Sequence, residues 1–317
     1  MAKRNELNKA IFQDEAEARM WLEAHLWPHG AVCPKCGTVG NSSPIKTRDG
    51  WYQCNEAACR GQFTVTVGTL FERSHIPLNK WLMVAFLMCA SKKGMSALQI
   101  SRMVGVSYKS TWFMCHRLRE AMRDMKPSRL GGLGKTVESD ETYVGGKEKN
   151  KHARKRTGDR GFAGTTKEAV FSLVERDGRV RSNHMSDGVT ASTLREKLNE
   201  QLAWGSTLYT DANPQSTGAG KKWKHESVNH SAGEYVRGDA STNTIESYFA
   251  ILKRGIYGTY HHVSAQHLKR YLGEFDFRYN ERTALGVNDA ERTSKALAGI
   301  VGKRLTYRRT RREGAEV

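Results

Sequence analysis

Three acidic residues in the second half of the sequence have the types and settings that a divalent metal site needs. Asp140 falls inside a strand-like stretch, Asp211 ends a second one, and Glu246 lies in a segment with helical periodicity. Two carboxylates fixed on strands and one fixed on a helix could hold two Mg²⁺ or Mn²⁺ ions about 4 Å apart. Such ions activate an oxygen nucleophile and stabilise a leaving oxygen, which is the chemistry of phosphoryl transfer.

The segment around Glu246 has two distinct sides when it is drawn as a helix. At about 100° per residue, three apolar residues fall on one side, where they would pack against a sheet: Ile245, Phe249 and Leu252. Asn243, Glu246 and Lys253 fall together on another side. One side would therefore be buried while the other presents an amide, a carboxylate and an ammonium. A merely solvated surface would show the same pattern.

Spacing alone does not single out these three acids, because the chain has 33 aspartates and glutamates. Glu138 and Glu141 lie next to Asp140 in sequence and compete with it for the first ligand position. The sequence therefore leaves the first ligand open among these three residues.

Four cysteines near the N-terminus have the spacing of a zinc site. They form a C-x2-C knuckle and a C-x4-C knuckle with 17 residues between them: Cys33 and Cys36, then Cys54 and Cys59. Four thiolates can close a tetrahedron around one Zn²⁺ and leave no open coordination position, so the ion would be structural. The alternative is four unrelated buried or disulfide-bonded cysteines, but without a secretion signal a disulfide framework is not expected.

The surroundings of the knuckles fit a small β-sheet. Trp51–Gln53 would lead into the second knuckle as a strand, and Phe63–Val67 is a further β-branched and aromatic stretch. Cys89 and Cys115 lie on apolar helical stretches, so we expect them to be ordinary core residues.

A series of helical segments between residues 76 and 126 predicts a helix-turn-helix. Leu78–Ala90 is apolar and would support two further helices. The first of these begins after the N-cap candidate Ser96, and its expected inward residues are Leu98, Ile100 or Met103, and Val104.

The turn of this motif would be Gly105–Ser107, with Ser107 capping a third helix that runs to about Arg123. This third helix would offer a set of polar side chains to DNA: Tyr108, Lys109, Ser110, His116 and Arg117. A plain helical hairpin would show the same pattern.

The charge of the chain favours a polyanionic partner. The 317 residues include 51 Lys and Arg against 33 Asp and Glu, which gives a formal net charge of +18. Each neutralised phosphate releases a condensed counterion, so a protein this basic gains affinity for nucleic acid. Ribosomal and membrane-surface proteins share this bias, and charge alone therefore indicates a class of partner but no reaction.

Membrane insertion and secretion are not expected. The longest apolar run is the ten residues from Trp81 to Ala90, about half of what a bilayer-spanning helix needs. The N-terminal segment has no apolar core of the signal-peptide kind. We therefore expect a cytoplasmic protein that has no membrane partner.

Beyond residue 130 the pattern favours an α/β sheet domain. The Gly-rich stretch Leu130–Gly134 reads as a linker, and strand-like and helix-like segments then alternate to residue 281. The expected strands are Thr136–Val144, Ala169–Glu175, Val180–His184, Thr207–Thr210 and Ser227–His230. The expected helices are Thr190–Trp204, Thr242–Gly255 and Ser264–Tyr279.

Two basic segments flank this domain or interrupt it. Lys147–Arg160 carries seven Lys or Arg against two acids, and Lys303–Arg312 adds six basic residues. Solvated charge runs would look alike, but in a chain this basic we expect contacts with the DNA backbone. The residues expected to contact DNA are Lys109, Arg117, Lys151, Arg154, Lys155, Arg156, Lys253 and Arg254.

The sequence resembles the bacterial insertion-sequence transposases of the DDE class, in the branch with an N-terminal zinc ribbon (the ISXO-like group). The resemblance spans nearly the whole chain, and the run from Asn243 to His262 is its most specific part. Besides the cysteine knuckles, the matching motifs are Ser139–Lys147, Tyr209–Asp211, Val228–Ser231, Asn243–Ser247, Leu252–His262 and Phe275–Asn280.

This resemblance implies a ribonuclease-H-like catalytic domain with Asp140, Asp211 and Glu246 as its metal ligands. Thirty-four residues separate Asp211 from Glu246, similar to the spacing in many DDE enzymes. Lys253 matches the lysine that such enzymes use near the DNA. Some relatives carry asparagine as the third ligand, which leaves Asn243 as an alternative, but Mg²⁺ prefers the carboxylate of Glu246 to a neutral amide.

The expected organisation is a multi-domain α+β protein. It would comprise a zinc ribbon with an N-terminal helix (1–75), a helix-turn-helix (76–128), a ribonuclease-H-like α/β catalytic domain (129–300) and a basic tail (301–317). The implied reaction is hydrolysis at the ends of an insertion sequence, followed by attack of the freed 3′-hydroxyl on target DNA. The expected partners are the terminal inverted repeats, target DNA and further copies of the chain, as a homodimer or higher oligomer, at the bacterial nucleoid.

Two other functions fit the same residues. One is a zinc-ribbon DNA-binding regulator whose catalytic domain is inactive, and it would bind DNA without metal-dependent cleavage. The other is a nuclease of the same fold that cuts DNA but never joins it. A strand-transfer assay distinguishes the nuclease from the transposase.

Overall fold

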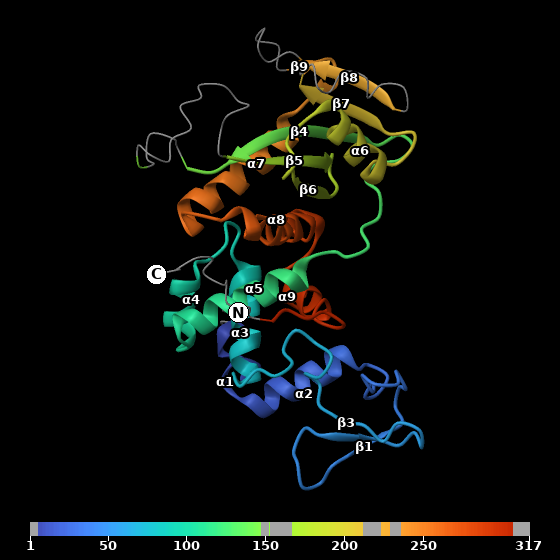
Figure 1. Cartoon of the computed structure of the whole chain (residues 1–317), viewed down its shortest axis with the longest axis vertical. Coiled ribbons are helices and arrows are strands. Elements are labelled where there is room, and N and C mark those ends of the chain that lie inside the picture. Colours follow the sequence, from blue (N-terminus) through green and yellow to red (C-terminus); the bar gives the residue numbers. More distant parts are fainter. Residues whose placement is uncertain (1–5, 147–151, 153–166, 212–222, 229–235, 307–317) are drawn as a thin grey trace, which may run out of the picture. The chain divides into compact units, whose positions relative to one another are not determined.

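The structure is a computed structural model that describes residues 6–146, 152, 167–211, 223–228 and 236–306. The described chain forms two compact units of mixed α/β character (Figure 1). The first comprises residues 6–91, 95–122 and 288–306, and the second comprises residues 92–94 and the described parts of 123–287. None of the described helices has the length and apolar character that crossing a membrane requires.

The first unit begins with short helices and a three-stranded antiparallel sheet. The elements are η1 (Glu6–Asn8), α1 (Ala10–Gln13), α2 (Glu15–Leu26), β1 (Ser42–Pro44), β2 (Tyr52–Cys54) and β3 (Gln62–Phe63). Asp14 caps α2 by accepting a hydrogen bond from the Glu17 amide at 2.9 Å. The strand expected around Tyr52 is confirmed. Of the β-branched and aromatic stretch Phe63–Val67, only Phe63 lies in a strand, because the chain turns from Thr64 onward.

Three of the helices in this unit have the bounds that the sequence suggested: α3 (Leu78–Ala90), α4 (Ala97–Val104) and α5 (Tyr108–Met122). Ser96 caps α4 by accepting from the Gln99 amide at 3.2 Å. Gly105 ends α4 with a φ of 70°, a left-handed conformation that favours glycine. Ser107 then accepts from the Ser110 amide at 3.3 Å at the start of α5.

The predicted inward residues of α4 are partly wrong. Ile100 and Val104 are fully buried, but Leu98 and Met103 each keep 49% of their surface exposed. The cysteines Cys89 and Cys115 are buried in the helical core, as expected.

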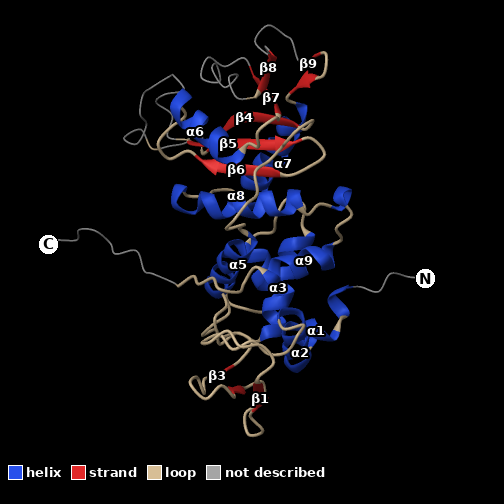
Figure 2. Cartoon of the chain, turned by 90° about the vertical axis from the view of Figure 1, so that its right-hand side faces the viewer, coloured by secondary structure: helices blue, strands red, loops and turns tan. Residues whose placement is uncertain are grey.

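A fourth helix, α9 (Asp289–Ala298), returns from the end of the described chain to pack against α3 and α5 (Figure 2). The Arg292 guanidinium donates to the Cys89 carbonyl at 2.9 Å, and the Leu70 amide donates to the Ile300 carbonyl at 3.1 Å. From the sequence, the residues of α9 were expected to belong to the catalytic domain (129–300). The packing assigns α9 to the first unit instead.

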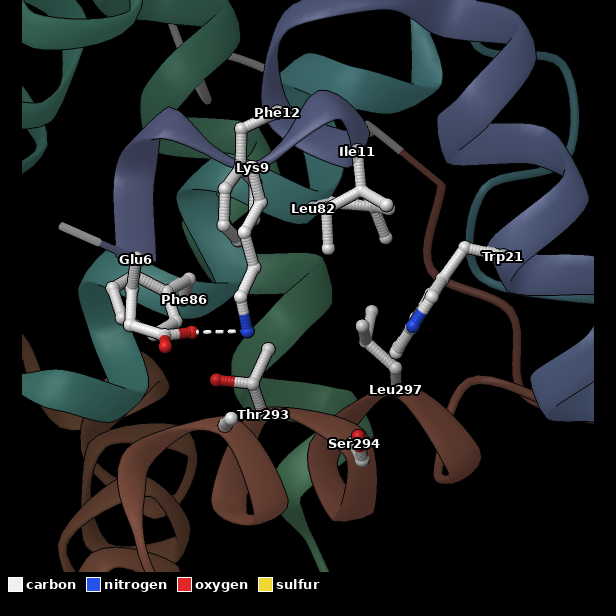
Figure 3. Close-up of a pocket in the computed structure, with 11 residues that line it drawn as sticks. Glu6, Lys9, Ile11, Phe12, Trp21, Leu82, Phe86, Thr293, Ser294 and Leu297 are labelled. Carbon is white, nitrogen blue, oxygen red and sulfur yellow. Dashed lines mark ion pairs between the residues drawn. The ribbon is translucent and has the colours of Figure 1, made fainter. Parts of the chain in front are cut away.

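A small apolar pocket lies where α9 meets the N-terminal helices and α3 (Figure 3). Phe12, Leu82, Phe86 and Leu297 provide much of its lining, and a 2.5 Å ion pair between Lys9 and Glu6 lies among its lining residues. Space of this kind shows that the helices are not closely packed at this point.

The second unit is built on a five-stranded sheet with the order β6-β5-β4-β7-β8. The strands are β4 (Thr136–Val144), β5 (Glu168–Glu175), β6 (Val180–His184), β7 (Thr207–Asp211) and β8 (Lys224–Val228). The first three strands pair antiparallel in chain order, while β7 joins β4 in parallel and β8 joins β7 in parallel. β4 is therefore the first strand of this sheet along the chain and also its central strand, with β5 and β6 on one side and β7 and β8 on the other.

Helices cover both faces of this sheet (Figure 1). α6 (Ala191–Gln201) packs on one face, where Leu194 and Leu198 join the cluster around Phe171. α7 (Asn243–Gly255) and α8 (Ala265–Asn280) pack on the other face. The side chains that alternate along β4 therefore point to two different cores.

Shorter elements complete the second unit: β9 (Val236–Arg237), β10 (Ala240–Ser241), a π-helix η8 (Ile256–Tyr260) and η9 (Thr283–Leu285). The expected strands and helices of this region all have counterparts. The largest shifts in bounds are three residues: β8 begins three residues earlier than predicted, and α6 ends three residues earlier, at Gln201. His230, the predicted end of that strand, lies outside the described residues.

Candidate functional site

Asp140 and Asp211 lie side by side on neighbouring parallel strands. The register of β4 with β7 pairs Glu138 with Tyr209 and Ser139 with Thr210, so each aspartate is the next residue along its strand. Since side chains two residues apart share a face, Asp140 lies on the face of Glu138 and Asp211 on the face of Tyr209. The sheet therefore presents two carboxylates together on the face that α7 and α8 cover.

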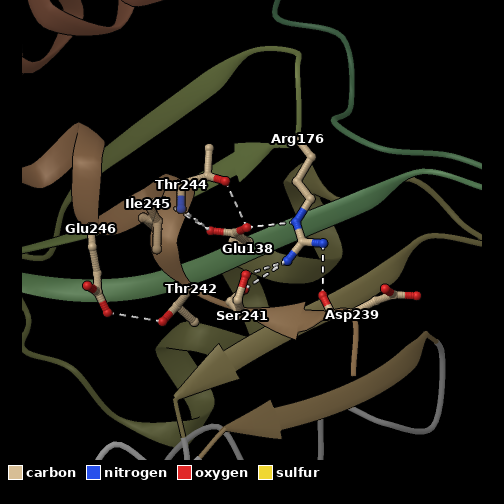
Figure 4. A network of polar contacts seen from close by, with 8 residues as sticks. All are labelled: Glu138, Arg176, Asp239, Ser241, Thr242, Thr244, Ile245 and Glu246. Carbon is tan, nitrogen blue, oxygen red and sulfur yellow. Dashed lines mark hydrogen bonds and ion pairs between the residues drawn. The ribbon is translucent and has the colours of Figure 1, made fainter. Parts of the chain in front are cut away.

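Glu246 reaches the same region from the first turn of α7. The buried side of this helix is formed by Ile245, Tyr248, Phe249 and Leu252, all of which are in the core cluster on that face of the sheet. Asn243, Glu246 and Lys253 are exposed on the other side, as the helical pattern predicted. The Thr242 hydroxyl donates to the Glu246 carboxylate at 3.2 Å, which orients it (Figure 4).

The structure separates the three acids of β4 that the sequence left open. Glu138 is fully buried, and both of its oxygens accept hydrogen bonds from protein donors. Glu141 points to the opposite face from Asp140 by strand alternation. Asp140 remains as the β4 carboxylate at the position next to Asp211.

Burial, together with the negative charges of Asp140 and Asp211, raises the pKa of Glu141 to about 7. Glu141 itself lies on the opposite face and is not part of the donor set. Hard oxygen ligands are the ones that Mg²⁺ prefers. The donor set of Asp140, Asp211 and Glu246 therefore fits Mg²⁺ or Mn²⁺.

Glu138 instead joins β4 to the start of α7 (Figure 4). Its carboxylate accepts from the Thr244 amide at 2.9 Å, from the Ile245 amide at 3.0 Å and from the Thr244 hydroxyl at 2.9 Å. Arg176 donates to the same carboxylate at 2.8 Å through its Nε. The donors of the protein itself therefore satisfy this buried carboxylate.

Arg176 is a residue that the sequence analysis missed. It follows β5 and donates to the Asp239 carbonyl at 2.9 Å and to the Ser241 hydroxyl at 2.8 Å, in the segment that leads into α7. Its guanidinium also lies over the Tyr209 ring, 4.9 Å from the centroid. No motif marks this arginine, because its partners are far from it in sequence.

The four cysteines of the first unit converge as their spacing predicted. The Sγ atoms of Cys33, Cys36, Cys54 and Cys59 all lie within 4.8 Å of one another. Two of the separations are 3.7 and 3.6 Å, close to the roughly 3.8 Å edge of a tetrahedron with Zn–S bonds of about 2.3 Å. The cluster fits one structural Zn²⁺.

The first knuckle has the geometry that a metal loop needs. Gly37 adopts a φ of 81°, and its amide donates to the Cys33 carbonyl at 2.9 Å. Hydrogen bonds from Thr38 lower the pKa of the Cys36 thiol to about 6, whereas burial raises that of Cys54 to about 12. Three aromatic rings pack together behind the cluster. The Trp27 ring lies edge to face with Tyr52 and with Phe63, and Tyr52 stacks on Phe63.

The residues expected to contact DNA fall into three groups. Lys109, Lys253 and Arg254 are exposed. Lys151, Arg154, Lys155 and Arg156 lie outside the described residues, as does most of the basic tail. Arg117 is half-buried and lies over the Phe113 ring at 4.8 Å.

The contacts of Arg117 indicate a structural role. Its guanidinium donates to the carbonyls of Leu305 at 3.2 Å and Glu72 at 3.4 Å, and desolvation lowers its pKa. His116, which the helical pattern placed among the polar positions of this helix, is buried and packs on Trp112 at 4.1 Å between centroids. The expectation that His116 is offered to DNA is therefore wrong.

Comparisons with known proteins agree on one family. The model of the ISXO2-like transposase domain matches residues 129–280, and the model of the transposase zinc-ribbon domain matches residues 13–62. An uncharacterized protein in transposable element ISH50 of Halobacterium salinarum is 29% identical over 282 residues, which are 84% of this chain and 91% of that protein.

Among solved structures, the Mos1 transposase paired-end complex with left transposon end is 12% identical, and the match covers 58% of this chain and 75% of that chain. The TM-score of 0.20 is too low to support any argument about the fold.

Proposed function

Because the chain belongs to the ISXO2-like transposases and carries their zinc ribbon, we propose that it is an active DNA transposase. It cuts DNA at the ends of an insertion sequence and joins the freed 3′-hydroxyl to target DNA. Asp140, Asp211 and Glu246 are the proposed ligands of two Mg²⁺ or Mn²⁺ ions. The zinc ribbon has a structural ion, so the two kinds of metal have separate tasks.

One observation carries this proposal: the two aspartates occupy the same register position on neighbouring strands, on the face covered by the helix that presents Glu246. Asp140 and Asp211 come together through the order of the sheet, and we infer that Glu246, on the helix α7 packed on the same face, completes the set. A merely structural domain has no need to gather negative charge in this way, since the repulsion destabilises it.

The topology supports a ribonuclease-H-like fold for the second unit. Three antiparallel strands followed by two parallel ones, in the order β6-β5-β4-β7-β8, place the first strand at the centre. The candidate ligands then fall on the central strand, on its parallel neighbour and on a following helix, in agreement with what the sequence resemblance implied.

The chain's own residues would divide the work of phosphoryl transfer. Asp140 and Asp211 provide rigid oxygen ligands from strands, and Glu246 provides a third from α7. When bound, the divalent ions activate the attacking oxygen and stabilise the leaving one. Thr242 holds the Glu246 carboxylate through its hydroxyl.

DNA would be bound by basic residues in both units. Lys253 and Arg254 are exposed about two helical turns, or roughly 10 Å, beyond Glu246 on α7, within reach of a phosphate next to the site. In the first unit, α4 and α5 would act as a helix-turn-helix with Lys109 at the start of its second helix. The terminal inverted repeats and the target DNA are the proposed partners, and bringing two ends together calls for at least a homodimer.

The test is cleavage and joining of a duplex that carries the end of the insertion sequence. Wild type is compared with Asp211→Ala and Glu246→Ala, and with Asp187→Asn, an exposed aspartate elsewhere in the second unit, as matched control. Metal dependence is read by omitting Mg²⁺ or replacing it with Ca²⁺, because EDTA would also remove the zinc. We expect joined product from wild type and the control only, and only with Mg²⁺ or Mn²⁺.

The outcomes separate the alternatives. Cleavage without joining would identify a nuclease. Tight DNA binding without cleavage by any variant would identify an inactive regulator and would remove the catalytic assignment of all three acids.

A further inference from the structure

We propose that Glu138 and Arg176 are positioning residues that fix the three candidate metal ligands relative to one another. The inference rests on the proposed function, because it concerns the same site. The residues in contact, which we call the Glu138 network, are Glu138, Arg176, Tyr209, Ser241, Thr244 and Ile245. Figure 4 shows all of them except Tyr209.

The helix that carries Glu246 does not cap itself. The N-cap residue of α7 is Thr242, whose side chain makes no capping hydrogen bond and whose φ and ψ of −114° and 19° differ from the usual extended cap conformation. Its hydroxyl donates to the Glu246 carboxylate instead. The first turn of α7 therefore needs acceptors for its amides from another element.

Glu138 supplies those acceptors from β4. Its carboxylate accepts from the amides of Thr244 and Ile245, which are the second and third residues of the helix. A negative charge at this end also interacts favourably with the helix dipole. The cap therefore does two things at once: it completes the helix and ties its first turn to the strand that carries Asp140.

Arg176 connects the Glu138 carboxylate to β7, the strand that carries Asp211. Its guanidinium binds the Glu138 carboxylate, the Ser241 hydroxyl before α7 and the face of the Tyr209 ring on β7. A planar guanidinium with five donors can hold such partners in one arrangement, which a flexible ammonium cannot.

The spacing of the anchors matches the spacing of the ligands. Glu138, Tyr209 and Thr244 each lie two residues before a candidate ligand, namely Asp140, Asp211 and Glu246. On a strand, two residues bring the chain back to the same face. On the helix, Thr244 and Glu246 are both in the first turn. Each anchor residue thus lies two residues before a candidate ligand on the same element, and the network contacts all three elements.

The decisive variant is Glu138→Gln, which keeps the shape but removes the charge and part of the accepting capacity. Mn²⁺ binding is measured by the electron paramagnetic resonance signal of the free ion, without DNA. We expect the affinity to fall about tenfold, the scale seen when residues that orient metal ligands are changed. Hydrogen exchange of the peptide over residues 242–249 should accelerate, while the peptides of β5 and β6 keep their wild-type rates.

A double-mutant cycle distinguishes positioning from a general loss of charge. If Glu138 acts through Glu246, then Glu138→Gln causes no further loss of Mn²⁺ affinity in a chain that already carries Glu246→Gln. An equal loss in both backgrounds would overturn the proposal, because Glu138 would then affect the ion independently of Glu246. The matched control is Glu168→Gln, which alters a carboxylate on β5 that pairs with His184 at 2.7 Å, and it should bind Mn²⁺ as wild type does.

If Glu138→Gln does not fold, two milder variants test the positioning role. Thr244→Val removes only the hydroxyl bond to Glu138, and Arg176→Lys keeps the charge but loses the fork. Each should weaken Mn²⁺ binding less than Glu138→Gln and only in the presence of Glu246. Unchanged Mn²⁺ affinity together with unchanged exchange of residues 242–249 would overturn the proposal.

The proposed function can fail separately. If Glu246→Gln and Asp211→Asn both leave Mn²⁺ binding unchanged, the metal site itself is refuted. If they weaken binding measurably while the cycle shows no coupling to Glu138, the site stands and the positioning role is refuted.

Discussion

The cysteine cluster and the carboxylate site gather their ligands in opposite ways. All four thiols come from residues 33–59 and from two tight knuckles, with only a small sheet behind them. The three carboxylates come from residues 140–246, on two strands and a helix whose packing buries much of the core of the second unit. One site is made by local turns and the other by tertiary structure.

Because of this difference, we expect the two metals to contribute differently to folding. A ribbon with three short strands buries little apolar surface, so it depends on its ion for stability. The carboxylates lie on a sheet that is folded by its own core and braced by the Glu138 network. We therefore expect the cysteine cluster to need its metal in order to fold, and the proposed carboxylate site to need a folded sheet in order to bind a metal.

Loss of the zinc ligand Cys54 should have the largest effect on structure. Structural zinc contributes on the order of 10 kcal/mol in small zinc domains, so Cys54→Ser should leave residues 28–63 unfolded and open to proteolysis. The control Cys115→Ala changes a buried cysteine outside the cluster and should keep one zinc per chain. Zinc content and limited proteolysis are the measurements. Retention of a folded ribbon without zinc would remove the contrast between the two sites.

Loss of the carboxylate Asp211 should abolish activity without unfolding the chain. Several kcal/mol of transition-state stabilisation depend on the metal, so Asp211→Asn should slow single-turnover cleavage by about 10³-fold. The thermal unfolding midpoint should stay within a few degrees of wild type or rise, because a repelling charge is removed. A collapse of the midpoint would mean that this site, too, is needed for folding.

Truncation of Leu252 should weaken the carboxylate site from a distance. This side chain is fully buried between α7 and the sheet, and Leu→Ala in such a core costs about 2–5 kcal/mol. We expect chemical denaturation to report that loss, with lower Mn²⁺ affinity and unchanged zinc content. Equal loss of both metals would contradict the independence of the two sites.

The smallest effect should come from Lys253, which is exposed on α7. Lys253→Ala should reduce the slope of log affinity for DNA against log salt by about one unit. It should leave both metals bound. Fluorescence anisotropy at several salt concentrations measures the slope, and Lys197→Ala, on the helix α6, provides a control that should not change it. An unaltered slope would place Lys253 away from the phosphates.

The same contrast explains how much the sequence could predict. The cysteine cluster follows from ligand spacing, because local knuckles need no information about the rest of the fold. The strands and helices of the two units follow from periodicity and from residues that cap helices, such as Ser96 in the first unit and Thr190 in the second. The buried side of α7 follows from its periodicity as well, whereas the choice of Asp211 as a candidate ligand depended on the family resemblance.

The remaining features depend on contacts between distant segments. Strand alternation puts Glu138 and Asp140 on the same face, but only the packing of α7 shows that Glu138 is buried beneath its first amides. Arg176 has no sequence signal at all. The helix α9 did have one, since Asn288 and Glu291 form a capping box that could have been recognised. Its place in the first unit could not, because that depends on packing.

The helix α9 also makes the first unit depend on a segment that is synthesised after all five strands of the sheet in the second unit. When residue 287 leaves the ribosome, every strand of the five-stranded sheet is already available to pair, whereas α3 and α5 still lack the helix that packs on them. The sheet can fold at that moment, while an apolar surface of the helical unit stays exposed and prone to aggregation. A product that stopped before Asn288 would thus keep all three carboxylates on a folded sheet and leave the helical unit unfinished.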